Sequence, residues 1–276
     1  MNYRHSFHAG NSADVVKHCL LIALVQALQQ KPGALTLIDT HAGCGLYDLD
    51  GEEAQRTGES MQGVQRAFAD PNPLLDDYRA AVRAVNVGAA PHLYPGSPQI
   101  LAQLLRSQDF LILNEKHPED AYALRGVMRG TSAAVHERDA YEFWLAMLPP
   151  RTPRGVVVVD PPYEQLDERA RITATLAAAH RKWAHGVTVI WYPLKDRATH
   201  GRWKQQLRQL GIPKFLVAEH WLYDSEQPGL YNGAGLYIVN PPYAFTQALP
   251  PLLEALRVAL APEGHRGEIT TDWLGD

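Results

Sequence analysis

Short apolar runs alternate with longer segments of mixed polarity along most of this chain. A run such as Val156–Val159, which has no polar residue, is typical of a strand buried on both faces of a sheet. Seven strands are expected, at Leu35–Ile38, Phe110–Leu113, Ala133–His136, Val156–Val159, Val187–Trp191, Phe215–Ala218 and Leu236–Val239. Several of the segments between them have apolar residues at helical spacing. The alternation predicts an α/β fold with a doubly wound, seven-stranded, mostly parallel sheet.

Two segments near the N-terminus depart from this alternation. Asp14–Gln30 has a broad apolar face at helical spacing, so a helix should precede the first strand. Between Tyr47 and His92 acids, Gln and Ala dominate. We therefore expect residues 47–93 to form an inserted small helical subdomain, and residues 1–46 and 94–276 to form the main domain.

The bulk composition is that of an ordinary water-soluble protein. The chain has 276 residues, of which 46% are hydrophobic and 20% charged, and its two cysteines imply no disulfide framework. Apolar stretches such as Cys19–Val25 are shorter than a membrane span, and the N-terminus has no signal-peptide pattern. We expect a cytoplasmic monomer that does not associate with membranes.

The charge is unevenly distributed. Residues 195–214 contain six Lys or Arg against one acid, a local charge of +5, whereas the whole chain carries −4. A basic segment on an acidic body favours either a contact with phosphates or a solvated helix face. Charge alone leaves both interpretations open.

Acidic residues follow each of the first four strands, at Asp39, Glu115, Asp139 and Asp160. In a doubly wound sheet, ligands bind beyond the carboxyl ends of the strands, so these side chains should meet at one rim. A single acid in such a place is often only a helix N-cap. Four in succession favour a binding site.

The residues around this rim suit a nucleoside-like cofactor. Glycines in the loop after the first strand let backbone amides approach a ligand, and His41 lies in the same loop. Glu115 can accept the two ribose hydroxyls, and Asp139 can accept an adenine amino group beside the Ala140 amide. The chain has no phosphate-binding Gly-x-x-x-x-Gly-Lys-Ser/Thr loop. A cofactor without phosphates fits better, which points to S-adenosylmethionine.

The tetrapeptide Asp160-Pro161-Pro162-Tyr163 directly follows the fourth strand. A carboxylate and a proline-fixed carbonyl at Pro161 can accept the two hydrogens of a ring amine, while Tyr163 offers a face for the ring. These three residues are the predicted catalytic residues. The near copy Asn240-Pro-Pro-Tyr243 follows the seventh strand, away from the rim, where a strand exit before proline explains it.

Other residues bear on metals and on nucleic acid. The chain has twelve histidines, but His5 and His8 are not at helical i, i+4 spacing and no Cys-x-x-Cys is present, so we expect no metal. Tyr3, Arg4 and Phe7 form an aromatic and basic cluster suited to stacking and phosphate contact.

Four motifs together resemble one known family. The run from Tyr3 to His18, with Asp39–Gly43, Tyr94–Pro98 and Asp160–Tyr163, closely resembles the bacterial RlmJ family of 23S ribosomal RNA adenine-N6 methyltransferases. The resemblance covers the chain from Tyr3 to about residue 242 and implies a Rossmann-like class I methyltransferase core with a small helical insertion.

The resemblance also implies roles for single residues. It implies Asp160 as the catalytic residue, Tyr3 as a contact to substrate RNA with Arg4 beside it, and an rRNA partner. The cofactor contacts that it implies are Lys17, His18, His41, Ser97, Glu115, Asp139, Ala140 and Asp160.

Two other functions remain open from the sequence. Asp-Pro-Pro-Tyr is shared by amino-methylating enzymes, so the chain can be a DNA adenine-N6 methyltransferase, although an insertion of fewer than fifty residues is small for a DNA-recognition domain. It can also be a non-catalytic nucleic-acid-binding protein on the same scaffold, against which the four intact rim acids argue.

Overall fold

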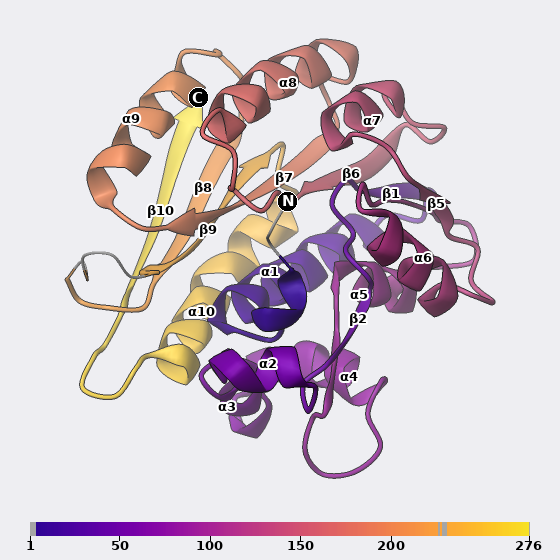
Figure 1. Cartoon of the computed structure of the whole chain (residues 1–276). Coiled ribbons are helices and arrows are strands. Elements are labelled where there is room, and N and C mark those ends of the chain that lie inside the picture. The colour runs from indigo at the N-terminus through magenta and orange to yellow at the C-terminus, as the bar shows by residue number, and fades with distance from the viewer. Residues whose placement is uncertain (1–3, 226, 228–230, 276) are drawn as a thin grey trace.

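The computed structural model describes residues 4–225, 227 and 231–275. Eight strands form one central sheet in the order β10-β8-β9-β7-β6-β1-β4-β5 (Figure 1). Their bounds are β1 Leu35–Asp39, β4 Phe110–Asn114, β5 Ala134–His136, β6 Arg154–Val159, β7 Val187–Leu194, β8 Phe215–Trp221, β9 Gly233–Val239 and β10 Glu268–Gly275. Strands β5, β4, β1, β6 and β7 run parallel, while β9 is antiparallel to both β7 and β8.

The predicted α/β class with a mostly parallel sheet is confirmed, but the count of seven strands is wrong. The eighth strand, β10, pairs antiparallel with β8 at the edge of the sheet. Its sequence Glu-Ile-Thr-Thr-Asp-Trp-Leu-Gly has no apolar run, because most of its side chains are not buried. Edge strands of this kind lack the pattern by which buried strands are recognised.

Helices cover both faces of the sheet (Figure 1). The α-helices are α1 Ser12–Gln29, α2 Glu52–Thr57, α3 Val64–Ala69, α4 Asp76–Arg83, α5 Ser97–Leu104, α6 Pro118–Val127, α7 Ala140–Ala146, α8 Glu168–Lys182, α9 Arg197–Arg208 and α10 Tyr243–Leu260. One hydrophobic cluster joins α1, α5 and α10 to one face of the sheet, and a second joins α7, α8 and α9 to the other. The result is a three-layer α/β/α sandwich.

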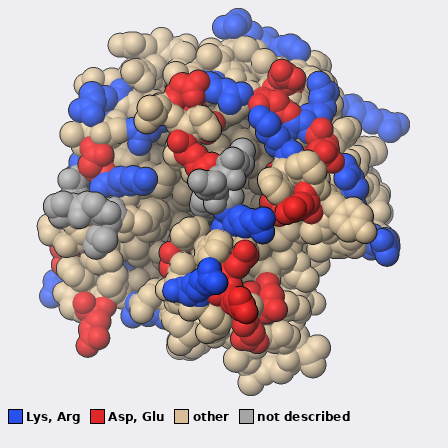
Figure 2. All heavy atoms as spheres, viewed as in Figure 1, with Lys and Arg blue, Asp and Glu red and all other residues tan. Residues whose placement is uncertain are grey.

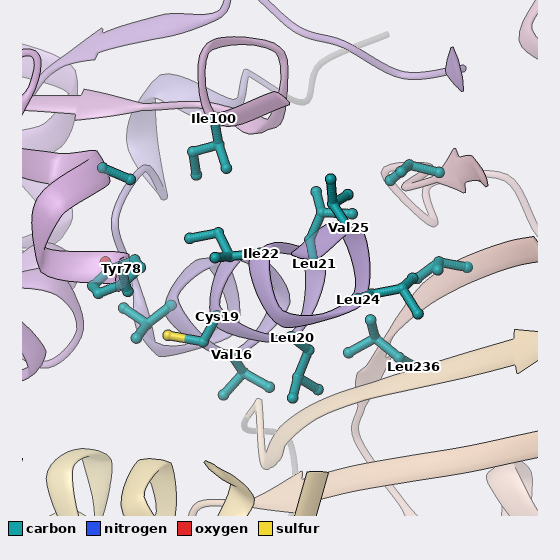
Figure 3. Close-up of a cluster of buried hydrophobic side chains, with 14 of the residues drawn as sticks. Val16, Cys19, Leu20, Leu21, Ile22, Leu24, Val25, Tyr78, Ile100 and Leu236 are labelled. Carbon is teal, nitrogen blue, oxygen red and sulfur yellow. The ribbon is translucent and has the colours of Figure 1, made fainter. Parts of the chain in front are cut away.

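Helix α1 is the centre of the first cluster. Figure 3 shows its apolar side chains pointing in several directions, with Tyr78, Ile100 and Leu236 around it. By length and composition α1 is apolar enough to cross a membrane, yet 83% of it is buried inside this fold. It is thus a core helix, and its fixed position decides where the polar residues of its first turns point.

Residues 47–93 are helical, as expected. They hold α2, α3, α4 and the short 3₁₀ turns η2 Glu59–Met61 and η3 Pro73–Leu75. An antiparallel ribbon, β2 Leu46–Asp48 with β3 Leu93–Pro95, brings the chain into this segment and out of it. Apolar residues of α3 and α4 belong to the same cluster as α1, so the insertion shares the main core. The division into two domains stays a prediction.

Candidate active site

A cavity of about 830 Å³ lies beyond the carboxyl ends of the parallel strands. Its walls come from the loops after β1, β4, β5 and β6, from the first turns of α1, and from the N-terminal and inserted segments. Most of the predicted site residues line it, namely Lys17, His41, Ser97, Glu115, Asp139, Ala140, Asp160, Pro161 and Tyr163. Residues from six separate stretches of sequence therefore meet in one place.

Lys17 links the first helix to the end of β6. Its Nζ lies 2.6 Å from Asp160 Oδ2 and 2.9 Å from Asp14 Oδ1, with only 7% of the lysine side chain exposed. Burial by itself lowers the pKa of Lys17, but the two carboxylates outweigh it and raise that pKa. The ammonium is charged, and it holds Asp160 through one oxygen only.

Asp14 completes this cluster from the N-terminal side. Its Oδ2 accepts from Gly10 N and lies 2.9 Å from His5 Nε2. Although burial opposes ionisation, His5 and Lys17 hold the pKa of Asp14 well below its usual value. The sequence arguments missed Asp14 and His5 as members of the site. The i, i+3 spacing of Asp14 and Lys17 on a helix was the available sign.

Tyr163 has an unusual backbone conformation, with φ of 55°. Its hydroxyl donates to Trp191 O at 2.6 Å, and its ring meets the Trp191 ring edge-on at 5.9 Å. Burial raises the pKa of the Tyr163 phenol. The phenol is therefore neutral and fixed against β7, and the Asp-Pro-Pro-Tyr loop is held at both ends.

Asp39, the last residue of β1, holds the loop that follows this strand by hydrogen bonds. Asp39 is fully buried; its Oδ2 accepts from Ser97 Oγ at 2.7 Å and its Oδ1 accepts from His41 N at 3.1 Å. Burial raises the pKa of Asp39 to about 6 and lowers that of His41 to about 4. Asp39 does not line the cavity, so it supports Ser97 and His41 and leaves ligand contact to them.

Glu115 joins the loops after β1 and β4. Its two carboxylate oxygens accept from Gly43 N and His117 N, both at 2.8 Å. Burial raises the pKa of Glu115. Gly43 has a φ of +60°, and a Cβ there would lie 2.2 Å from the Tyr47 hydroxyl. The positive φ favours glycine at position 43, while the approach of backbone amides of this loop to a ligand stays a prediction.

Asp139 is the N-cap of α7 and accepts from Tyr141 N at 3.1 Å. It also faces two cations that the sequence arguments did not anticipate: Lys116 Nζ lies 3.1 Å and Arg171 3.2 Å from Oδ2. Burial by itself raises the pKa of Asp139, but the two cations and the α7 amides outweigh burial and lower that pKa. The Arg171 guanidinium stands over the Tyr141 ring, 4.2 Å from its centroid.

Known proteins resemble this chain over nearly its whole length. A family model described as "Ribosomal RNA large subunit methyltransferase D, RlmJ" matches residues 32–275. The chain is 37% identical to "Ribosomal RNA large subunit methyltransferase J" of Escherichia coli K12 and 35% identical to the Haemophilus influenzae protein of that name, over 99% of each chain. The crystal structure of a Legionella pneumophila protein superposes with a TM-score of 0.89 at 31% identity, covering 96% of this chain and 98% of the other.

The chain belongs to the RlmJ family. The resemblance seen in its motifs is thereby confirmed, and so is the expected class of fold.

Not every residue that the RlmJ resemblance implies reaches the cavity. The fully buried ring of His18 points elsewhere: its Nδ1 lies 2.7 Å from the Tyr94 hydroxyl and the two rings stack. On a helix, neighbours in sequence point about 100° apart, so Lys17 and His18 cannot both face the cavity in the same way. Arg4 pairs with the exposed Glu119 at 3.4 Å. Tyr3 lies outside the described residues.

The second Pro-Pro motif of this RlmJ-family chain follows the interior strand β9, at the amino-terminal ends of the parallel strands and opposite the cavity. Because β9 is antiparallel to β7, Val239 pairs with Thr188 near the start of β7. Asn240 Nδ2 donates to Ala184 O and Gly186 O at 2.9 and 2.8 Å. Its side chain therefore satisfies two backbone carbonyls far from the cavity.

Acidic residues pair with three of the six cations in the basic segment 195–214, at Arg197, Lys204 and Arg208. Lys204 reaches the buried Glu219 at 2.7 Å, and Arg208 pairs with Asp272 on β10 at 3.1 Å. Figure 2 shows acidic and basic side chains interspersed over the face around the cavity. The phosphate contact and the solvated helix face both stay open, since Lys204 and Arg208 are paired while Lys195 lines the cavity. Within the described residues, no group of three His, Cys, Asp or Glu is arranged to hold a metal ion.

Proposed function

We propose that this protein transfers the methyl group of S-adenosylmethionine to the exocyclic N6 of an adenine in 23S ribosomal RNA. The observation that carries the proposal is Asp160, presented to the cavity at the carboxyl end of β6 and held through one oxygen by Lys17. Membership of the RlmJ family and the names of the two curated relatives support the choice of ribosomal RNA.

The residues of the cavity fit the proposed cofactor. S-adenosylmethionine, when bound, supplies a methyl group on a positively charged sulfur. The cavity offers acidic side chains to such a cation, among them Glu115, Asp139 and Asp160. One oxygen of Glu115 accepts from Gly43 N and the other from His117 N. A carboxylate has about four lone-pair positions, so Glu115 can also accept from the ribose hydroxyls. Asp139 and the Ala140 amide would hold the adenine edge.

Asp160 prepares the amine for attack. An exocyclic adenine amine is a weak nucleophile because its lone pair is delocalised into the ring. Asp160 Oδ1, which Lys17 leaves unoccupied, accepts one amine hydrogen, and the Pro161 carbonyl accepts the other. The amine nitrogen would take the methyl group that the bound cofactor supplies, leaving the cofactor's sulfur as a neutral thioether, and Asp160 or water would take the proton that the nitrogen then loses. Positioning supplies most of the rate enhancement.

The target adenine has to leave its stack to reach Asp160. Such bases are offered by single-stranded loops and by hairpins, where extrusion costs little. We place Tyr163 and Pro161 against the flipped base, and Tyr3 and Arg4 near the RNA backbone. We also propose that the protein acts in the cytoplasm as a monomer and without a metal.

A methylation assay tests the proposal. Deproteinised ribosomal RNA should incorporate labelled methyl groups with the wild type, and Asp160→Ala should lose at least about 100-fold in kcat. Asn240→Ala is the matched control and should keep wild-type kcat if it folds. Near wild-type turnover by Asp160→Ala, or loss in Asn240→Ala alone, would contradict this assignment. Equal or better incorporation into DNA would favour a DNA methyltransferase.

A further inference from the structure

Glu59, from the insertion, uses both of its oxygens on the N-terminal segment. Its Oε1 lies 2.9 Å from His8 Nδ1, and its Oε2 accepts from Asn11 Nδ2 at 3.0 Å. The hydrogen bond to Glu59 raises the pKa of His8. Burial opposes ionisation of Glu59, but His8 and Asn11 hold its pKa below the usual value. All three residues line the cavity. A charged carboxylate therefore joins the insertion to the chain that leads into α1.

Backbone contacts bring the same two segments together. Val64 N donates to Gly10 O at 2.7 Å, and the Thr57 hydroxyl donates to Phe7 O. The packing is so close that a Cβ on Gly63 would lie 2.1 Å from Gly10 O. The insertion thus holds the N-terminal segment at several successive points, and Glu59 supplies two of the side-chain bonds among them.

These contacts continue to the catalytic carboxylate. Asn11, held by Glu59, caps α1 by accepting from Asp14 N at 3.0 Å. Asp14 in turn binds Lys17, and Lys17 binds Asp160. Every step is a hydrogen bond of 2.6 to 3.0 Å. The position of Lys17 therefore depends on a segment that the insertion holds in place.

We propose that Glu59 is a positioning residue, which fixes the N-terminal segment against the insertion and so keeps Lys17 on Asp160 during methyl transfer. Glu59 acts through Asn11 and His8, with no bond of its own to Asp160. The inference assigns a task in the reaction to the insertion, and its kinetic test rests on the proposed function.

Steady-state kinetics on ribosomal RNA test this role. Glu59→Ala removes both side-chain bonds, whereas Glu59→Gln keeps one acceptor oxygen and should be less affected. We expect kcat to fall about tenfold or more for Glu59→Ala, since small misplacements of reacting groups are costly, with the KM for the cofactor nearly unchanged. The matched control is Glu52→Ala, on the exposed first turn of α2, where acidic side chains gather (Figure 2).

A double-mutant cycle separates positioning from a general loss of stability. If Glu59 acts with His8, the pair Glu59→Ala and His8→Ala should lower kcat by less than the product of the two single effects. Glu52→Ala combined with His8→Ala should give the simple product. A multiplicative result for Glu59 and His8, or a kcat for Glu59→Ala within about twofold of the wild type, would overturn the proposal.

Hydrogen exchange gives a readout that does not depend on activity. In Glu59→Ala the amides of residues 8–15 should exchange faster than in the wild type, and in Glu52→Ala they should not. A wild type that transfers no methyl group to RNA would refute the proposed function, while faster exchange in Glu59→Ala would still support the positioning contact. Unchanged exchange would refute that contact whatever the activity.

Discussion

Replacing Lys17 by Met should destabilise the fold through two carboxylates at once. Lys17 is the shared partner of Asp14 and Asp160, whose side chains are 3% and 15% exposed. Removing one partner of a buried ion pair costs about 3–5 kcal/mol, because the remaining charge is left without compensation. Asp14 keeps its bonds to His5 and Gly10, and Asp160 is partly hydrated. We therefore expect the lower end of that range, about 3 kcal/mol.

Urea unfolding, followed by circular dichroism, measures this loss as a lower midpoint with an unchanged slope. Lys31→Met is the control, since Lys31 is exposed just beyond the same helix and should change stability by less than about 0.5 kcal/mol. Adding Asp14→Asn to Lys17→Met should recover at least about 1 kcal/mol, because one of the two unpaired charges is then absent.

The pH dependence gives an independent check. Because the pKa of Asp14 is lowered in the folded protein, its ionisation stabilises the fold above the unfolded value near 3.8, and this stability is lost as pH falls through the folded pKa. Without Lys17 the pKa of Asp14 in the folded protein is lowered by less. The difference in stability between wild type and Lys17→Met should therefore stay constant from pH 7 to about 4 and narrow only as pH falls further, through the folded pKa of Asp14 in the variant. A loss below about 1 kcal/mol, or a difference that does not narrow, would refute the reasoning.

Three further changes test other parts of the structure. Glu115→Gln should weaken cofactor binding about 10- to 100-fold by calorimetry, since Glu115 joins two loops and is the residue that we propose to accept the ribose hydroxyls; unchanged affinity would exclude Glu115 from the cofactor site. Asn240→Ala should cost about 1–3 kcal/mol in urea unfolding while kcat stays at the wild-type value, because two carbonyls lose their donor. Lys204→Ala should destabilise by about 3 kcal/mol, since Glu219 is 3% exposed, without changing the salt dependence of RNA binding. If the RNA affinity of Lys204→Ala depends less on salt concentration than that of the wild type, Lys204 contacts the RNA phosphates.

Local sequence patterns were sufficient to predict most of the strands and helices. Most of the seven expected strands could be recognised because their residues are apolar and buried, which is a property of a few neighbouring residues. Strand β5, at the other edge of the sheet, is the exception, since none of its three residues is buried. Strand β10 could not be recognised, since one exposed edge leaves its sequence mixed. The same locality explains why the acids after β1, β4, β5 and β6 were found: a strand end and an acid beside it are adjacent in sequence.

Contacts between residues that are far apart in the sequence could not be predicted from local sequence patterns. Lys17 and Asp160 are 143 residues apart, and Glu59 lies 48 residues from Asn11. Their meeting depends on how far α1 is rotated about its axis and on where the insertion packs. The same rotation brings His18 Nδ1 to the Tyr94 hydroxyl, and the role of His18 in binding the cofactor stays a prediction.

The sequence by itself determined the class of fold, the order of its elements, the reaction implied by Asp160-Pro161-Pro162-Tyr163, and the family. These properties can be recognised from short stretches of sequence, because the residues that carry each property are close together in the chain. The tertiary structure decided which oxygen of Asp160 is free, which helix face Lys17 takes, and which cations of the basic segment pair with acids of β8 and β10. Side-chain partners are chosen by packing across the whole chain, and no local pattern records that choice.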